Sequence, residues 1–309
     1  MPHGSYVDAF TVAEGIARGH TPGRMRGPAF TAPFHGVRAP AGDPQPRSEA
    51  DRRLAEYAPH LWQLRLLAER YAPRLRPGQF YSHDTALALL GAPTPRGWTP
   101  SLHVSVYRPS ARLEARGVIG HRLQARPPDV RVVHGLPVES PARAWVQVSR
   151  SWSADDLIAA ADSLVLPTRK LATPDEIRSE AAAMRGHALD GVIADVRVGA
   201  ESFRETRLRL ACRRAGLPEP QLNVDLFDDR GTFIARIDQL YEEFGVAAEY
   251  DGRHHAADAR QFARDADRWE AIRAAGWDHV RILRHHLEPD PRPAVAKIRA
   301  ALVRGGWWG

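Results

Sequence analysis

The alternation of apolar and polar positions predicts a regular order of elements in the last third of the chain. Apolar residues at helical spacing predict a helix over 201–215, and Gly216 ends it. Three runs with strand character follow, joined by the short turns DDRG and EEFG. A long helix, a fourth strand and a last helix complete the order αβββαβα. The predicted strands cover 221–227, 233–241, 245–250 and 278–283, and the two later helices cover 258–275 and 291–303.

Strands joined by such short turns form an antiparallel meander, and a strand that follows a long helix can return to the same sheet by a crossover. We therefore expect an α/β fold over 199–309, in which helices flank a mixed sheet.

The pattern at the start of the chain predicts short elements. TVAE at 11–14 is a capping-box sequence that opens a helix ended by Gly19, and Thr21-Pro22 opens a second helix. With 30–37 as a wing, these elements predict a short winged helix over 1–38. An ordinary helical hairpin is the alternative interpretation.

The stretch 39–47 is rich in proline and glycine and predicts a linker. Residues 49–198 then predict an α/β middle region, so the N-terminal part as a whole is α+β. Ser82, His83 and Asp84 are sequence neighbours, which favours a helix cap over a catalytic triad. Helices are expected around 49–71, at 82–90, 141–149, 153–165 and 174–195, and strands at 102–107 and 130–133.

Composition narrows the class of protein. With 43% hydrophobic and 26% charged residues, a chain of 309 residues predicts a folded protein of about two domains. Cys212 is the only cysteine, which excludes disulfides within the chain, cysteine-rich zinc sites and iron–sulfur clusters. No apolar run approaches the ~20 residues that span a bilayer, and the first residues lack a signal-peptide pattern. We expect a cytoplasmic protein with no membrane partner.

The net charge of +6 favours nucleic acid as a partner. Residues 1–198 hold 25 basic and 19 acidic residues, and the rest of the chain holds 18 of each, so the N-terminal part is the expected electrostatic anchor for DNA. Arg24 and Arg26 are the candidate DNA contacts there. Arg260, Arg264 and Arg268 form a second stripe on the long helix, for which an ion-paired, solvated face is the alternative interpretation.

Three carboxylates of the C-terminal part suggest a metal site. Glu205 lies on the apolar stripe of the first helix and is expected to face the sheet, although an exposed acid in the first turn is the alternative. Asp238 and Glu249 flank the turn at 242–245 almost symmetrically, which places them side by side on adjacent strands. Two neighbouring acids repel each other unless a cation lies between them.

Oxygen ligands favour Mg²⁺ or Mn²⁺, and such an ion can activate water for attack on a phosphodiester. His255 follows the second acidic strand and could assist proton transfer. The alternative for the acids is a surface set balanced by Arg236 and Arg253.

Four segments of the chain together resemble the DUF559 proteins. The segments are SFRETRLRLACRRAGLPEPQLNV, GTFIARIDQLY, VAAEYDGRHH and RDADRWEAIRAAGWDHVRIL. The DUF559 domain is related to the very short patch repair endonucleases and belongs to the PD-(D/E)XK nuclease superfamily. The match covers about 201–303 and implies a restriction-endonuclease-like αβββαβ core, which agrees with the order predicted above.

The resemblance also implies roles for individual residues. Glu205 corresponds to the helix acid, Asp238 to the metal-binding aspartate and Glu249 to the second strand acid, with Mg²⁺ or Mn²⁺ as the cofactor. His255 matches the position of a histidine important in the patch repair enzymes. Asp251 stands where the E-x-K motif has lysine, so lysine-assisted activation of water is not expected.

The upstream part resembles the corresponding region of actinobacterial DUF559 proteins, which is similar to abortive-infection antitoxins of the AbiE type. FTVAEGIARGHTPGRMRG, FYSHDTALALLGAPTP and VHGLPVESPARAWVQVSRSWSADDLIAAADSLVL carry this resemblance. Those antitoxins have a winged helix and repress transcription.

Two hypotheses follow. The first is a metal-dependent DNA endonuclease with Glu205, Asp238, Glu249, Asp251 and His255 at its catalytic site. The second is a non-catalytic DNA-binding regulator, for which the sequence names neither an operator nor a toxin partner. A protein-interaction module is a third possibility, without a positive signal.

Overall fold

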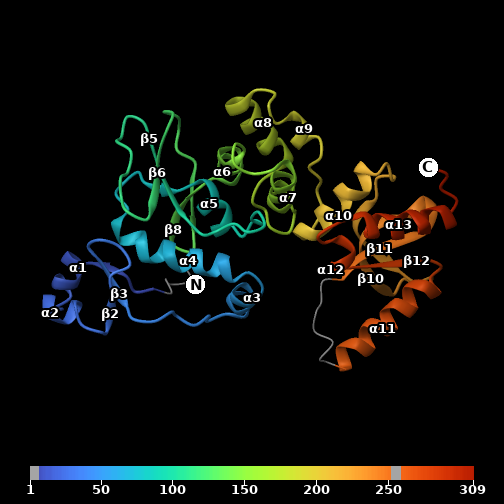
Figure 1. Ribbon diagram of the computed structural model, residues 1–309, viewed down its shortest axis with the longest axis horizontal. Helices are drawn as coiled ribbons and strands as arrows, with labels where there is room; N and C mark the ends of the chain where they lie inside the picture. The colour runs from blue at the N-terminus through green and yellow to red at the C-terminus, as the bar shows by residue number, and fades with distance from the viewer. Residues whose placement is uncertain (1–6, 252–258) are drawn as a thin grey trace. The chain divides into compact units, whose positions relative to one another are not determined.

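The computed structural model describes residues 7–251 and 259–309 and shows a mixed α/β protein (Figure 1). The chain forms two compact units. Met1–Asp156 and Asp175–Leu189 belong to the first unit, and Leu157–Pro174 and Asp190–Gly309 belong to the second. The parts expected at 1–38, 49–198 and 199–309 differ from this division: 1–38 share a unit with most of the middle region, and residues 157–174 and 190–198 belong to the C-terminal unit. Within the described residues, no helix combines the length and the apolar character needed to cross a membrane.

Two short helices and three short strands begin the first unit. The predicted capping box is present: the Glu14 backbone N–H donates to Thr11 Oγ1, and the Glu14 carboxylate accepts from the Thr11 backbone N–H. The strands pair in the antiparallel order β1-β3-β2, so 30–37 contributes one strand of a small sheet and the start of another. The elements are β1 (Phe10–Thr11), α1 (Val12–Ala17), α2 (Pro22–Met25), β2 (Phe30–Thr31) and β3 (Val37–Pro40).

The N-terminal segment shares a core with the helices that follow it. Val7 and Ala39 pack against Trp62 and Leu66, and Ala39 is fully buried. The predicted linker at 39–47 therefore begins inside strand β3, and its first residue is part of the hydrophobic core.

A five-stranded mixed sheet with the order β6-β5-β4-β8-β7 organises the rest of the first unit. The helix expected around 49–71 is two helices that meet at Ala58, where Pro59 occupies the first turn of the second helix. The strands at 102–107 and 130–133 are confirmed, whereas β6 and β8 were not predicted. The elements are α3 (Glu49–Tyr57), α4 (Pro59–Tyr71), η1 (Ala72–Arg74), β4 (Phe80–Tyr81), α5 (His83–Leu89), β5 (Leu102–Tyr107), β6 (Val118–Leu123), β7 (Val130–Val133), β8 (Leu136–Glu139), α6 (Pro141–Val148) and α8 (Pro174–Arg185).

The second unit has the element order predicted for its C-terminal part. Its four strands form a sheet in the order β12-β11-β10-β9, where β11 and β12 are parallel and the other pairs are antiparallel. The elements are α7 (Ala154–Leu164), α9 (Asp190–Ile193), α10 (Phe203–Arg214), β9 (Gln221–Phe227), β10 (Phe233–Tyr241), η2 (Glu242–Phe244), β11 (Val246–Asp251), α11 (Ala259–Ala274), β12 (Asp278–Leu283), α12 (Arg284–Leu287) and α13 (Arg292–Arg304).

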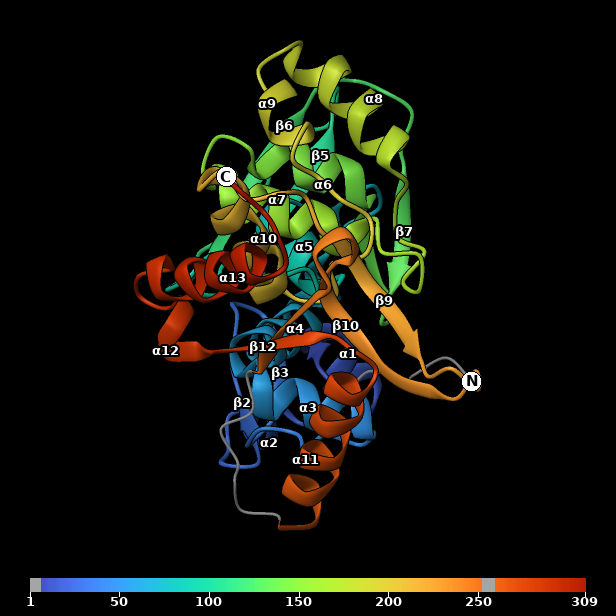
Figure 2. The ribbon, with the colours of Figure 1, turned by 90° about the vertical axis from the view of Figure 1, so that its right-hand side faces the viewer.

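Helices cover both faces of this sheet. Leu208 of α10 and Ile298 of α13 belong to one buried cluster with Val246 and Ala248 of β11. Ala247 points the other way and joins the cluster that contains Ile272 of α11. Figure 2 shows α11 and α13 on opposite sides of β12. The strand residues alternate between the two faces, as the period of two requires.

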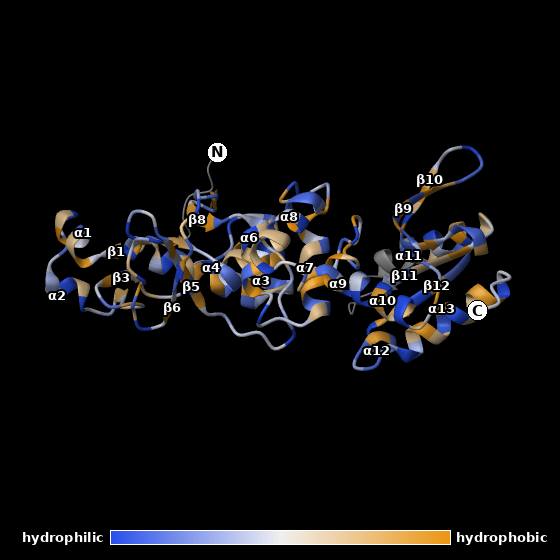
Figure 3. Ribbon diagram, turned by 90° about the horizontal axis from the view of Figure 1, so that it is seen from above, coloured by the Kyte–Doolittle hydropathy of each residue, from blue (hydrophilic) through white to orange (hydrophobic). Residues whose placement is uncertain are grey.

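Two further features frame the sheet. Helix α7 is attached to α10 by a buried ion pair, in which Asp162 Oδ2 accepts from Arg209 Nη2 and Thr206 Oγ1, both at 2.9 Å. The hairpin of β9 and β10 extends away from the other elements of the unit and ends in a hydrophilic turn (Figure 3).

Candidate functional site

Glu205 is held in the first turn of α10. Ser202 caps the helix, because its Oγ accepts from the Glu205 backbone N–H at 3.2 Å. The Glu205 carboxylate turns back and accepts from the Glu201 N–H at 2.7 Å and from Asn223 Nδ2 of β9 at 3.0 Å. The side chain is thus half-buried against the sheet rather than exposed in solvent.

Asp238 lies where the sequence placed it, beside Glu249. The ladder pairs Gln239 with Ala248, so the next step along the two strands brings Asp238 opposite Glu249. Asp238 Oδ2 accepts from the Tyr250 backbone N–H at 2.7 Å. Burial, followed by the negative charges of Glu205 and Glu249, raises the pKa of Asp238 to about 8. All three predicted acids therefore interact within one site.

Glu249 is buried and carries two contacts from the other side of the site. Its Oε1 accepts from Arg268 Nη1 of α11 at 2.7 Å, and its Oε2 lies 2.5 Å from His279 Nε2 of β12. His279 is fully buried, and its Nδ1 has no hydrogen-bond partner within the described ranges. His279 was not predicted as a site residue. The strand predicted at 278–283 could have revealed it, because a histidine in a buried parallel strand needs a polar partner.

Asp251 contacts an arginine of the neighbouring strand. Arg281 Nη2 donates to Asp251 Oδ2 at 2.6 Å, and the Arg281 guanidinium stacks on Trp269 with its carbon 3.4 Å from the ring centre. The parallel register places Arg281 opposite Glu249. A cation thus lies beside the acids although Asp251 replaces the expected lysine.

The three carboxylates are neighbours, but they do not form a compact set of ligands. A metal ion needs at least three donor atoms close to one another. Within the residues that the structure describes, three side chains whose donor atoms all lie within 4.8 Å of one another are found in the first unit: His83, His103 and His121. Glu205, Asp238 and Glu249 form no such set. Glu249 instead directs its oxygens at Arg268 and His279.

Other predicted residues contribute less to the site. His255 lies outside the described residues, as do the side chains of Arg260 and Arg264. Arg268, the third member of that stripe, contacts Glu249. Its place within the site differs from the solvated face considered for this helix.

Arg24 and Arg26 are exposed at the end of α2, a helix of four residues. The backbone N–H of Arg24 donates to the capping Thr21 Oγ1 at 3.2 Å. Both side chains are accessible to solvent, and their role as DNA contacts stays a prediction.

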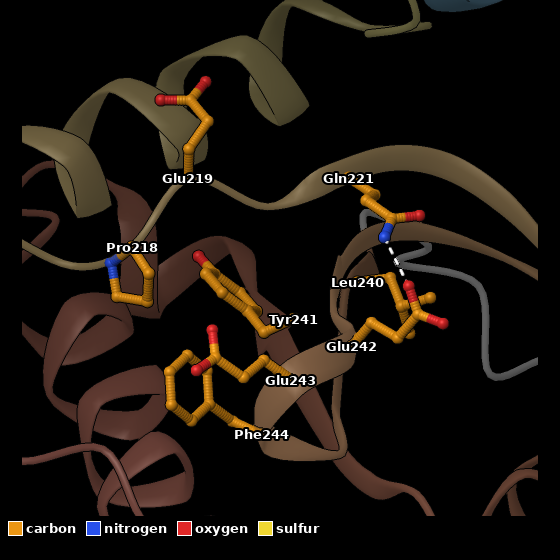
Figure 4. A pocket seen from close by; sticks show the side chains of 8 residues that line it. All are labelled: Pro218, Glu219, Gln221, Leu240, Tyr241, Glu242, Glu243 and Phe244. Carbon is orange, nitrogen blue, oxygen red and sulfur yellow. Dashed lines mark hydrogen bonds between the residues drawn. The ribbon is translucent and has the colours of Figure 1, made fainter.

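A cavity of about 400 Å³ lies at the opposite end of β10 from its hairpin turn, and none of the three acids lines it. Three glutamates line it instead, and Gln221 Nε2 donates to Glu242 Oε2 at 2.6 Å (Figure 4). Such an acidic lining repels phosphate, so this cavity does not fit a nucleic-acid substrate.

Comparisons with known proteins identify no characterised relative. Two proteins of Mycobacterium tuberculosis, Uncharacterized protein MT2308 of strain CDC 1551 / Oshkosh and Uncharacterized protein Rv2248 of strain H37Rv, are each 28% identical to this chain over 230 residues. The alignment covers 71% of this chain and 80% of each relative. No protein-family profile matches the chain, and no solved structure matches it significantly.

Proposed function

We propose that the protein is a metal-dependent DNA endonuclease of the PD-(D/E)XK type and a member of the DUF559 group. One observation carries the proposal: Glu205, Asp238 and Glu249, from three separate elements, bring their negative charges together at the two inner strands of one mixed sheet. A protein gains no stability from such repulsion, so a ligand of opposite charge is the simplest reason for the arrangement.

The architecture supports the same proposal. The second unit has the element order αβββαβ, with an antiparallel meander followed by a parallel strand, which is the core that the DUF559 resemblance implies. The acids of the two strands lie on the face of the sheet that α11 covers. Side chains alternate along a strand, so Asp238 lies on the same face as Leu240, and Glu249 and Asp251 lie on the same face as Ala247.

The donor atoms fit a hard divalent cation. Glu205, Asp238 and Glu249 would hold Mg²⁺ or Mn²⁺ through carboxylate oxygens, after Glu249 exchanges a contact with Arg268 or His279. The ion supplies a polarised water and charge stabilisation at the phosphodiester. Glu205 is oriented by the Glu201 N–H and Asn223, and Asp238 by the Tyr250 N–H, so two of the three acids are already positioned by the fold.

Basic side chains near the acids would bind the substrate. Arg268 and Arg281 each keep an Nε atom that is buried without a hydrogen-bond partner in the described part of the chain. A phosphate would reach these arginines through the exposed part of their side chains, which is 35% for Arg268 and 34% for Arg281. Guanidinium groups bind phosphate oxygens in a bidentate manner. His255 remains the predicted proton-transfer group.

Cleavage assays with the full chain test the proposal. Plasmid and single-stranded DNA are incubated with Mg²⁺ or Mn²⁺, and Asp238→Asn is compared with Asp225→Asn as a matched control. Asp225 is an exposed acid of β9 that pairs with Arg236. We expect Asp238→Asn to lose at least a hundredfold in rate while Asp225→Asn keeps native activity. Absent cleavage by the native protein, or equal cleavage by both variants, would refute the proposal.

The alternative is a DNA-binding regulator in which the nuclease-like unit is silent. The pairs Glu249–Arg268 and Asp251–Arg281 favour it, because the protein's own cations already neutralise two acids. This alternative predicts binding to the DNA upstream of its own gene, with affinity that falls steeply with salt. Replacing Arg24 and Arg26 by alanine would lower the slope by about one unit for each lost phosphate contact. Asp238→Asn would leave this binding unchanged.

A further inference from the structure

Three histidines of the first unit meet beside its five-stranded sheet. His83 begins α5, His103 lies in β5 and His121 lies in β6. The rings of His83 and His121 are stacked with centres 3.8 Å apart, and those of His103 and His121 are 5.1 Å apart. His103 Nδ1 lies 3.0 Å from His121 Nε2. All three side chains are half-buried, so solvent reaches the cluster from one side.

The fold holds this cluster from two directions. The parallel register pairs His103 with Ile119 and Ser105 with His121, so His103 and His121 are diagonal neighbours on one face. Helix α5 is attached to β5 at the same point, because the Ser82 N–H donates to the His103 carbonyl at 3.1 Å. Thr85 Oγ1 also accepts from the His103 N–H at 2.8 Å. The distance between the three rings is therefore set by backbone contacts.

The backbone of His83 adopts an unfavourable conformation. Its φ of 51° lies in the left-handed region, which residues with a Cβ rarely adopt. The Gln147 side chain stabilises this turn, since its Oε1 accepts from the His83 N–H at 3.0 Å. The turn brings the imidazole over His121. Backbone strain of this kind clusters at functional sites.

Hydroxyl groups orient two of the rings from behind. Ser101 Oγ lies 3.1 Å from His103 Nε2, and Ser82 Oγ lies 2.9 Å from His83 Nδ1. Ser105 Oγ in turn donates to Ser82 Oγ at 2.5 Å. These contacts leave His83 Nε2 and His103 Nδ1 for a ligand, and the His121 nitrogen nearest to them is Nε2, 3.0 Å from His103 Nδ1. Metal-binding histidines generally use their second nitrogen in this way.

We propose that His83, His103 and His121 bind one Zn²⁺ ion, with water or an external ligand in the fourth position. Three imidazole nitrogens are a donor set for Zn²⁺, whereas Mg²⁺ and Mn²⁺ prefer oxygen. Zn–N bonds of 2.0–2.1 Å in a tetrahedron separate two nitrogens by about 3.3 Å. The 3.0 Å between His103 and His121 is within a few tenths of an ångström of that value.

The electrostatics of the cluster agree with this assignment. Burial, followed by the neighbouring histidines, lowers the pKa of His83 to about 3. Burial is also the main reason why the pKa of His121 is lowered to about 4. The pKa of His103 is lowered as well, chiefly by burial, and a lowered pKa favours the neutral imidazole that binds metal. The negative charge of Asp84 raises the pKa of His103 and of His121, whereas the positive charge of Arg112 lowers the pKa of His121. The stacked rings need only rotate about χ2, a broad torsion.

Zinc binding to the full chain tests the proposal. Native protein is titrated with Zn²⁺ against a chromophoric chelator, and the visible spectrum after Co²⁺ substitution reports the geometry. His103→Asn and His121→Asn are compared with His35→Asn, an exposed histidine of the same unit. We expect each cluster variant to lose one equivalent of Zn²⁺ and the tetrahedral Co²⁺ bands, and His35→Asn to keep both.

A milder variant separates loss of zinc binding from loss of folding. Ser101→Ala removes the hydroxyl next to His103 Nε2 and should weaken Zn²⁺ binding about 10–100-fold, with unchanged thermal unfolding in chelator. Equal Zn²⁺ stoichiometry and affinity in the native protein and in all three cluster variants would overturn the proposal, as would no bound Zn²⁺ in the native protein. The result is separate from the nuclease proposal, because Asp238→Asn should bind Zn²⁺ as the native protein does.

Discussion

Replacing Asp238 by asparagine should stabilise the metal-free protein while it abolishes DNA cleavage. Asparagine keeps an oxygen that can accept from the Tyr250 N–H, but it has no carboxyl whose ionised form Glu205 and Glu249 disfavour. A catalytic residue whose removal raises stability is the expected signature of a site arranged for a cation rather than for the fold itself.

The magnitude follows from the pKa of Asp238. Its rise from 3.8 to about 8 means that the folded protein binds more protons than the unfolded chain between these pH values, so stability falls as pH rises through this window. At pH 7 the folded protein still holds most of this proton, which the unfolded chain has lost about 3 pH units below, so the difference costs about 4 kcal/mol at 1.36 kcal/mol per unit. Partial solvent access and coupling to the other acids halve this figure, so the expected gain for asparagine is about 2 kcal/mol.

The assay is thermal and urea unfolding of the full chain in chelator at pH 5, 7 and 8, with Asp225→Asn as the control. The gain in stability from Asp238→Asn should be roughly threefold larger at pH 8 than at pH 5. At pH 5 the solution is only slightly above the unfolded pKa of the carboxyl, so the native protein has lost little of its stability there. Added Mg²⁺ or Mn²⁺ should stabilise the native protein and leave the variant unchanged. A gain that does not depend on pH, or a loss of stability at pH 8, contradicts the reasoning.

Two substitutions and one labelling experiment test the packing of the second unit. Arg268→Met should lower the free energy of unfolding by about 1–2 kcal/mol, because buried Glu249 loses a cationic partner; the loss is moderate because Arg268 is partly exposed to solvent. Urea unfolding measures it. Asp162→Ala should cost about 3 kcal/mol, since it removes the nearer carboxylate from the buried Arg209 and leaves only Glu219 at 3.9 Å, and amide exchange should rise first in α7 and α10. Burial raises the pKa of the Cys212 thiol to about 12, so a thiol reagent should react only after unfolding; rapid labelling of the native protein would contradict this.

Hydrophobic periodicity predicted the second unit well because its elements obey local rules. The strand boundaries of β9, β10 and β12 agree with the sequence prediction, since turn residues and Gly216 mark where each element starts or ends. The pairing of Asp238 with Glu249 also followed from symmetry about one short turn. These features depend on neighbours in sequence, which the pattern contains.

The first unit was predicted less well for the opposite reason. β6 has the sequence VIGHRL, in which a glycine and two polar residues interrupt the strand pattern, and β8 is only four residues long. Their pairing depends on strands distant in sequence. His121 therefore had no predicted place beside His103, and the histidine cluster had no motif spacing that could reveal it. Ser82 stands at the N-cap position as predicted, but its hydroxyl contacts His83 instead of capping the helix.

The choice between an active and a silent nuclease depends on what replaces the missing lysine. Asp251 recruits Arg281 from β12, so a cation still lies next to Glu249, and Trp269 fixes its orientation. A guanidinium group can hold a phosphate, but it has only donor N–H groups and does not accept a proton from water. The substitution would therefore preserve substrate charge binding and lose proton transfer, unless a neutral imidazole supplies it. If His255 is that imidazole, as the sequence predicts, a His255→Ala variant should lose cleavage activity, and cleavage at the native rate would exclude this form of the mechanism.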